Sequence, residues 1–281
     1  MDDLRFVSNS ASKSESSETR MQGENKQPSS TVATEAEYPL LRLHKVSKSF
    51  GPVQALYDVD LDVPAGCVTA LAGDNGAGKT VLVKTISGIW QPDSGETIWE
   101  GKPVQIHNPK EAEDMGITTV YQDLALCDNL DIVQNMFLGR EITHRRLLDE
   151  GSMELEAKHT LADLSVITVR SIRQSVASLS GGQRQAVAVG KAILRQSKLV
   201  LFDEPTAALG VSQTAVVLDL IKRLASRGVA VVVISHNMND LLQVSDRIAV
   251  MHLGHLVAQG PTSDFNLQNL ITLITTGKAV L

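Results

Sequence analysis

Residues 73–80 are the part of the sequence that most constrains what this chain can fold into. They read GDNGAGKT and fit the pattern G-x-x-x-x-G-K-[ST]. An apolar run, residues 67–72 (CVTALA), precedes them, and a helical segment, residues 81–86, follows. The run is too continuous for a half-exposed strand and too short for a helix, which predicts a buried strand. Strand, glycine-rich turn and helix in this order predict a phosphate-binding loop, because glycines let successive backbone N–H groups converge on phosphate oxygens at a helix N-terminus.

The residue types within this loop indicate a nucleotide that carries β- and γ-phosphates. The Lys79 ammonium is expected to reach those two phosphates, and the Thr80 hydroxyl to ligate Mg²⁺. Val81 offers no hydroxyl, so a phosphate contact at that position must come from its backbone. The predicted nucleotide-binding residues of the loop are Gly73, Asp74, Asn75, Gly76, Ala77, Gly78, Lys79, Thr80 and Val81.

Two further apolar runs, residues 198–202 and 229–234, predict buried strands of the same sheet. Between them, apolar residues repeat at i, i+3, i+4 and i+7 from Val217, which predicts an amphipathic helix. Ser212 is the expected N-cap of this helix, and Gly228 follows its end. Strand, helix and strand at this spacing predict a right-handed parallel crossover, and therefore an α/β protein.

Asp203 and Glu204 directly follow the first of these two strands. Because ligands bind beyond the carboxyl ends of parallel strands, this pair and the phosphate-binding loop are expected at one edge of the sheet. Asp203 is then placed to hold Mg²⁺ through water, and Glu204 to orient or deprotonate an attacking water. The alternative is a solvated acidic turn before Pro205, which the presence of the phosphate-binding loop disfavours.

Residues 179–183 (LSGGQ) precede the acidic pair in the chain. Ser180 and two glycines come before a helical run, residues 183–194, so a hydroxyl and bare backbone amides lie at a helix start. This arrangement predicts a second phosphate-binding element. One chain needs only one such loop to hold a nucleotide, which suggests that the second contacts the nucleotide of another subunit.

Together these motifs resemble those of the nucleotide-binding subunits of ABC transporters, over about residues 41–259. The resemblance implies ATP hydrolysis by an ABC-type P-loop NTPase. It also implies a parallel core sheet, an antiparallel β subdomain and an inserted helical subdomain at about residues 123–178. The matching motifs, in the family's order, are the loop at 73–80, Gln122 in VYQD, LSGGQ at 179–183, Asp203-Glu204 and His236 in ISHN.

The resemblance implies a role for each matching residue. Phe50, in KSFG, would stack on adenine, and Gln122 would sense Mg²⁺ or water and link to the membrane partner. Ser180 and Gly182 would contact the γ-phosphate held by the opposite subunit, while His236 would touch the γ-phosphate and hold the catalytic geometry. The expected catalytic residues are Glu204, His236, Gln122 and Lys79, and the expected Mg²⁺-binding residues are Thr80, Gln122 and Asp203.

One position departs from the family's pattern. The family usually carries Ser-Ala-Leu-Asp after the acidic pair, whereas this chain has Ala207-Ala208-Leu209-Gly210, so Gly210 replaces an aspartate that helps communication across the dimer. This run and residues 137–141 (FLGRE) are similar to the ATPases of simple-sugar importers of the ribose, xylose and fructose type. Many of those proteins carry two ATPase halves in tandem, whereas this chain carries one.

The composition fits a globular chain with a polar N-terminal segment. The first 39 residues hold eight serines, seven acidic residues and four basic residues. Such a segment cannot bury enough apolar surface to offset its ordering entropy, so we expect a disordered tail at residues 1–38 and the ATPase domain at residues 39–281. Two cysteines, no secretory signal pattern and no run of 18 apolar residues predict a cytoplasmic protein without a membrane-spanning helix.

The expected location is therefore the cytoplasmic face of the plasma membrane, with the protein bound peripherally. The partners implied by the resemblance are integral-membrane permease subunits, a second ATPase subunit in a homodimer and, indirectly, an extracytoplasmic substrate-binding protein. A net charge of −6 argues against a nucleic-acid partner.

Other functions are less consistent with the sequence. The main alternative is a soluble ABC-type ATPase acting on ribosomes or DNA, but such proteins typically carry two ATPase domains or a long coiled-coil insertion. A GTPase is disfavoured because the guanine-reading pattern Asn-Lys-x-Asp is absent. An inactive binding module is disfavoured because Lys79, Asp203, Glu204 and His236 are all present.

Overall fold

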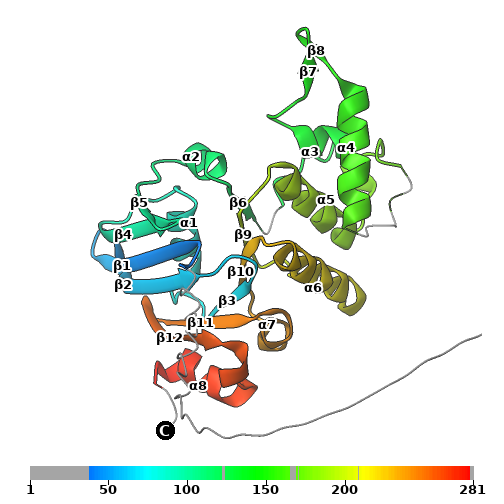
Figure 1. Ribbon diagram of the computed structural model, residues 1–281. Coiled ribbons are helices and arrows are strands. Elements are labelled where there is room, and N and C mark those ends of the chain that lie inside the picture. Colours follow the sequence, from blue (N-terminus) through cyan, green and yellow to red (C-terminus); the bar gives the residue numbers. More distant parts are fainter. Residues whose placement is uncertain (1–37, 122–123, 165–168, 170, 208, 279–281) are drawn as a thin grey trace, which may run out of the picture. The chain divides into compact units, whose positions relative to one another are not determined.

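The computed structural model describes residues 38–278 except 122–123, 165–168, 170 and 208 (Figure 1). The predicted tail falls almost entirely outside these residues, and so does Gln122. The elements in chain order are β1 Leu41–Phe50, β2 Val53–Val63, β3 Val68–Gly73, α1 Lys79–Ile86, β4 Ser94–Trp99, β5 Lys102–Val104, α2 Pro109–Asp114, β6 Ile117–Val120, α3 Ile132–Phe137, β7 Thr143–His144, β8 Leu147–Leu148, α4 Glu150–Asp163, the 3-10 turn η1 Val176–Ser178, α5 Gly181–Leu194, β9 Leu199–Asp203, α6 Val211–Ser226, β10 Ala230–Ile234, α7 Met238–Val244, β11 Arg247–His252, β12 His255–Pro261, the 3-10 turn η2 Thr262–Asp264 and α8 Leu267–Thr276.

The central sheet of the described residues has the strand order β12-β11-β3-β10-β9-β6. All neighbouring pairs are parallel except β11 and β12, which form an antiparallel hairpin at one edge. The three strands predicted from apolar runs are β3, β9 and β10, and β10 lies between the other two. In the register of this sheet, Ile234 at the end of β10 pairs with both Leu71 and Asp203. The carboxyl ends of β3, β9 and β10 therefore lie side by side.

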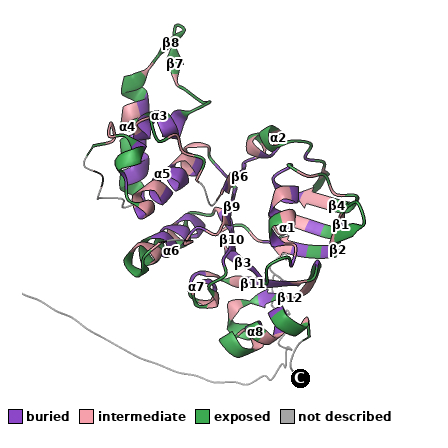
Figure 2. Cartoon of the chain, turned by 180° about the vertical axis from the view of Figure 1, so that it is seen from behind, coloured by how far each residue is buried: buried purple, intermediate pink, exposed green. Residues whose placement is uncertain are grey.

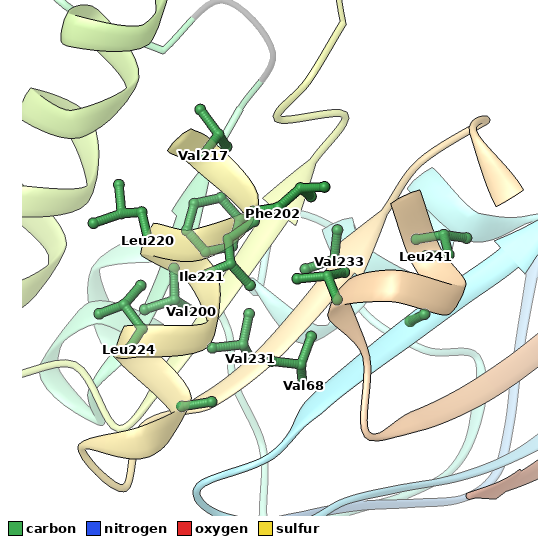
Figure 3. Packing of buried hydrophobic residues seen from close by; sticks show 14 of the residues in the cluster. Val68, Val200, Phe202, Val217, Leu220, Ile221, Leu224, Val231, Val233 and Leu241 are labelled. Carbon is green, nitrogen blue, oxygen red and sulfur yellow. The ribbon is translucent and has the colours of Figure 1, made fainter. Parts of the chain in front are cut away.

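Both faces of the central sheet are buried, as expected of parallel strands. Successive side chains of β10 enter two different cores: Val231 and Val233 pack on one face, and Val232 on the other. Helices α5, α6, α7 and α8 cover the first face, and Figure 3 shows Phe202 and Val231 packed against Ile221 of α6. Helix α1, helix α2 and the second sheet cover the other face.

The second sheet is antiparallel, with the strand order β2-β1-β4-β5. It shares one core with α1 and the central sheet, because Leu43 of β1 and Leu56 of β2 belong to the same buried cluster as Leu82 and Leu201. Strand β2 also lies next to β12, where the Gln259 side chain donates to the backbone oxygen of Asp60 at 3.3 Å. Near its start β2 contacts the phosphate-binding loop, where the Ala55 oxygen lies close to Gly78.

A third core lies among α3, α4 and η1, which fall in the region predicted to be mostly helical, and α5, which follows that region. Figure 2 shows how the buried sides of these helices face one another. The region also contains the β7–β8 hairpin, which the sequence did not predict, because each of its strands is only two residues long and shows no apolar alternation. Helix α5 contacts both α6 and β6 and so joins this core to the central sheet. No helix of the described part of the chain is long and apolar enough to cross a bilayer.

The predicted start of helix α6 is wrong by two positions. Gly210, not Ser212, is the N-cap, and the helix begins at Val211. The Gln213 side-chain oxygen accepts a hydrogen bond from the Gly210 amide at 3.4 Å and so provides a partner for a backbone donor at the helix start. The predicted end is confirmed, because Gly228 follows the C-cap with a φ of 88°. Helix α5 starts at Gly181, two residues earlier than predicted, because Ser180 caps it.

Two adjacent valines of α6 allow a matched test of this core. Val217 is 1% exposed and Val216 is 55% exposed, so the same change removes buried apolar contacts at one position only. We expect Val217→Ala to lower the free energy of unfolding by about 2 kcal/mol through lost burial and a residual cavity. Val216→Ala should change it by less than about 0.5 kcal/mol. Urea unfolding of both variants measures this, and equal losses would contradict the packing of α6 on the sheet.

Candidate active site

A cavity of about 220 Å³ lies at the carboxyl edge of the central sheet. It brings the phosphate-binding loop together with Glu204 and His236, which are far apart in the sequence but follow neighbouring strands. The residues that line it are Ala55, Asn75, Gly76, Ala77, Gly78, Lys79, Thr80, Val81, Glu204 and His236. The predicted convergence of the loop and the acidic pair at one edge is therefore observed for Glu204.

The backbone of the loop has the form that the glycine pattern predicts. It turns back on itself through a hydrogen bond from the Ala77 amide to the Asp74 oxygen at 3.1 Å. Gly78 then enters α1 in the left-handed region with a φ of 101°, and a Cβ at this position would lie 2.7 Å from the Ala55 oxygen. Only glycine fits both the conformation and the close approach. The free N–H groups of the first turn of α1 then face the cavity as a site for phosphate oxygens.

Lys79 lies at the mouth of this loop. Its Nζ donates to the backbone oxygens of Gly73 at 2.7 Å and Asp74 at 2.8 Å, and the residue is only 6% exposed. Burial lowers the pKa of the Lys79 ammonium, and the negative charges of Glu204, Asp74 and Asp203 act against that shift. The cation is thus held by neutral carbonyls of its own loop, where an anionic phosphate would be a stronger partner.

Asp203 ends β9, and Glu204 immediately follows it. Burial raises the pKa of the Asp203 carboxyl, and the neighbouring Glu204 charge raises it further. Glu204 has a φ of 54°, a left-handed conformation that costs a non-glycine residue about 1–2 kcal/mol. A hydrogen bond from the Glu204 amide to the Ile234 oxygen at 3.0 Å holds this bend against the end of β10. With this backbone bend, Glu204 lines the cavity.

His236 contacts Glu204 directly. Its Nε2 lies 2.5 Å from Glu204 Oε1, and both side chains remain partly exposed to the cavity. The backbone after β10 is held in place by Asn237, whose amide donates to the Ser235 hydroxyl at 3.1 Å and whose side chain caps α7. The pair therefore points a carboxylate and an imidazole toward the same space that the phosphate-binding loop faces.

The chemistry of Thr80 and Asp203 fits a magnesium ion. Mg²⁺ prefers oxygen ligands, and these residues supply a hydroxyl and a carboxylate. Within the described residues the Asp203 carboxylate makes no hydrogen bond, and its raised pKa reflects a partly buried charge that a cation would stabilise. The described residues contain no group of three or more His, Cys, Asp or Glu side chains arranged around one point, so most of the ion's ligands would come from phosphate and water.

Six of the described predicted residues do not line the cavity: Phe50, Gly73, Asp74, Ser180, Gly182 and Asp203. Phe50 ends β1, is 40% exposed and packs edge-on against Trp90, with the ring centroids 4.7 Å apart. Ser180 is the exposed N-cap of α5, and Gly182 is buried against Gln213 of α6. The roles of all the predicted site residues stay predictions, and Gln122 lies outside the described residues. The sequence analysis missed Ala55, because an alanine in a strand carries no chemical pattern that marks it as part of a site.

Comparison with known proteins identifies the class and then the family. The fold matches a crystal structure of a nucleotide-free ATP-binding cassette from an ABC transporter, with a TM-score of 0.73, 24% identity, and coverage of 83% of this chain and 95% of the other. It also matches an ABC transporter cassette in its ADP conformation, with a TM-score of 0.73, 24% identity, and coverage of 85% and 96%. The fold is thus that of an ATP-binding cassette. The ABC transporter family matches residues 56–207, more than half of the chain, and the protein belongs to that family.

Curated relatives have similar sequences over most of the chain. The fructose import ATP-binding protein FrcA of Rhizobium meliloti is 44% identical over 250 residues, which cover 86% of this chain and 96% of FrcA. The xylose/arabinose import ATP-binding protein XylG of Sulfolobus acidocaldarius is 43% identical over 84% of this chain and 94% of XylG. The ribose import ATP-binding protein RbsA 2 of Escherichia coli O157:H7 is 36% identical, and this chain covers only 46% of it.

The state of Asp203 gives a pH-dependent prediction. Folding raises the pKa of this carboxyl, so its cost to stability is absent below the ordinary pKa of aspartate, grows as pH rises from there to the folded pKa, and stays constant above it. We expect Asp203→Asn to raise the Tm of the nucleotide-free chain at pH 7 by about 2 °C, and the gain to shrink at pH 4. Thermal unfolding at both pH values measures it. A variant that is less stable than the unaltered chain at pH 7 would show that the carboxylate is satisfied in the folded state.

Proposed function

We propose that this chain is the ATP-hydrolysing subunit of an ABC transporter that imports a simple sugar. One observation carries the proposal: two relatives named for sugar import, FrcA and XylG, match it at 43–44% identity over nearly their whole length. The cavity supports the same conclusion, because it unites a phosphate-binding loop with a carboxylate and an imidazole.

The polar groups in the cavity and the adjoining Asp203 each have a task in this reaction. The loop amides and Lys79 bind the β- and γ-phosphates of ATP, and the Lys79 ammonium exchanges its carbonyl partners for phosphate oxygens. Glu204 accepts a hydrogen bond from the attacking water and takes its proton, while His236 holds the carboxylate in position at 2.5 Å. Thr80 and Asp203 would hold Mg²⁺, which neutralises charge on the phosphates when bound.

A second copy of the chain completes the site. Ser180 is exposed and does not line the cavity of its own chain, and it caps the N-terminus of α5, where the helix dipole favours an anion, so we place this helix start against a nucleotide held by a partner. A structural neighbour, a dimeric bacterial ABC transporter cassette, has a TM-score of 0.67 to this chain. In such a pair each ATP lies between the loop of one chain and the LSGGQ segment of the other.

In this proposal a separate permease forms the membrane part of the transporter, and the transported sugar does not contact this chain. The docking surface we propose is the region of α3, α4 and η1, because it lies in sequence between Gln122 and Ser180 and shares a core with α5. A permease bound there would respond to nucleotide binding through Gln122 at one end of this region and Ser180 at the other. The chain then acts at the cytoplasmic face of the plasma membrane, and a substrate-binding protein outside the cell acts on it only through the permease.

Glu204→Gln tests the assignment of the general base and the dimer. The amide keeps the shape of the side chain but cannot take a proton, so we expect hydrolysis to slow about 100-fold or more while MgATP stays bound. The trapped nucleotide should then hold two chains together at micromolar concentration. Light scattering after size exclusion measures this, and the double variant Lys79→Ala, Glu204→Gln should remain monomeric. A single variant that stays monomeric with ATP bound would rule out the shared-nucleotide dimer.

Co-expression with the cognate permease tests the transport function. We expect the chain to sediment with membranes only when the permease is present, and the sugar-loaded binding protein to raise ATP turnover of the assembled complex. Lys79→Ala should still sediment with the permease but show no turnover, because its docking surface is intact. Co-purification with ribosomes or DNA, without recruitment to membranes by any permease, would replace this function with that of a soluble ATPase.

A further inference from the structure

The phosphate-binding loop is held from outside by a turn that is remote in the sequence. This turn, His252–His255, joins β11 to β12, and its Gly254 amide donates to the Ala77 oxygen in the middle of the loop at 3.0 Å. The start of the loop also contacts the end of β11: Gly73 pairs with Met251, and a Cβ at Gly73 would lie 2.6 Å from the Met251 oxygen. The loop therefore has two backbone contacts with one hairpin.

The same turn also holds the strand that covers the loop. Gly254 accepts a hydrogen bond from the Tyr57 amide of β2 at 2.9 Å, and the Tyr57 ring stacks on His255 with the centroids 4.5 Å apart. A Cβ at Gly254 would lie 2.9 Å from both the Ala55 oxygen and the Tyr57 ring, and Ala55 lines the cavity. Loop, turn and β2 thus form one close-packed unit around Gly254.

The geometry of the turn explains why its amide is available. His252 pairs with His255, so Leu253 and Gly254 are the two central residues, with φ values of 46° and 83°. In a two-residue hairpin turn the cross-strand hydrogen bonds use the flanking residues, which leaves the amide of the second central residue free. That amide serves the phosphate-binding loop instead.

The other end of this connection is the C-terminal helix α8. His252 Nδ1 lies 2.8 Å from the Ile274 oxygen in the last turn of α8, and because a carbonyl only accepts, Nδ1 carries the proton. Gly277, the residue that ends α8, lies against the same ring, since a Cβ there would be 2.6 Å from His252 Cδ2. Helix α8 therefore fixes the position of His252, and His252 begins the turn that holds the loop.

We propose that the His252–His255 turn is a positioning element for nucleotide binding. It holds the Ala77 carbonyl, and with it the loop amides, in the geometry that receives phosphate, and α8 sets the turn through His252. The inference rests on the proposed binding of MgATP at residues 73–80. None of the side chains of the turn lines the cavity, so the turn acts on affinity through the loop and leaves the chemistry at Glu204 unchanged.

A pair of His252 variants tests the link to α8. In His252→Asn the amide nitrogen is bonded to Cγ, as Nδ1 is in histidine, so this variant keeps an N–H donor close to the original position. His252→Leu has a side chain of similar size to asparagine but no donor. We expect His252→Leu to raise the Kd for MgATP and the KM about tenfold, the effect of losing one positioning hydrogen bond, with kcat changed less than about twofold. His252→Asn should restore both constants to within about threefold of the unaltered chain. Hydrogen exchange of the peptide covering residues 73–80 should rise in His252→Leu only.

A pair of glycine variants provides the control for strain and stability. Gly254→Ala introduces both a positive-φ alanine and a clash with β2, whereas Gly101→Ala introduces only the former, because its φ is 74° and nothing lies within 4 Å of its Cβ. We expect Gly254→Ala to raise the Kd for MgATP about tenfold or more and Gly101→Ala to leave it unchanged. The Tm of both variants is measured as well. A higher Kd for Gly254→Ala than for Gly101→Ala, at similar Tm values, indicates a loss of loop positioning and not a general loss of stability.

The outcomes distinguish this inference from the function on which it rests. If the unaltered chain binds MgATP and folded His252→Leu binds it with the same Kd, the positioning role is wrong and the proposed function stands. If kcat falls with no change in KM, the turn acts on chemistry and the inference is also wrong. If the unaltered chain does not bind MgATP at all, the proposed function itself fails.

Discussion

The parallel pairing of β10 with β3 on one side and β9 on the other is the constraint on which the rest of this structure depends. Because these three strands run in the same direction and end in register, the segments that follow them leave the sheet at one edge. The phosphate-binding loop follows β3, Glu204 follows β9 and His236 follows β10, and all three line the cavity. A register shift of one residue in β10 would exchange its two buried faces and carry His236 away from Glu204. The packing of Val231 and Val233 against α6 therefore fixes the geometry of the site as well as the stability of the fold.

The site holds charges and strain that favour a bound nucleotide over the free chain. Burial disfavours the charged forms of both Lys79 and Asp203, and each would gain a partner of opposite charge from MgATP. Glu204 is kept in a left-handed conformation by its hydrogen bond to β10. Such features lower the stability of the empty protein, and they are typical of sites where binding and chemistry, not folding, determine the residues.

The LSGGQ segment is ordered by contacts within the chain itself. Ser180 caps α5 through a reciprocal pair of hydrogen bonds with Gln183, so the helix start is ordered before any nucleotide arrives. Gly181 and Gly182 lie against Leu209 and Gln213, which connects this segment to the residues that follow the acidic pair. Gly210 stands in that connection, where the family usually has an aspartate, and here its role is to begin α6.

The sequence by itself determined the chemistry of this protein and the identity of its main strands. The pattern from Gly73 to Thr80 allows few conformations, and continuous apolar runs such as β10 are stable only when buried on both faces, so these features follow from local rules. Local rules did not determine the start of α6 at Gly210, where the side chain of Gln213 decides the cap. They also did not reveal Ala55, the contact between His236 and Glu204, or the support of Ala77 by Gly254. Those contacts join segments that are distant in the chain and lack a chemical signature of their own, and only the packing of the two sheets and α8 around the loop brings them together.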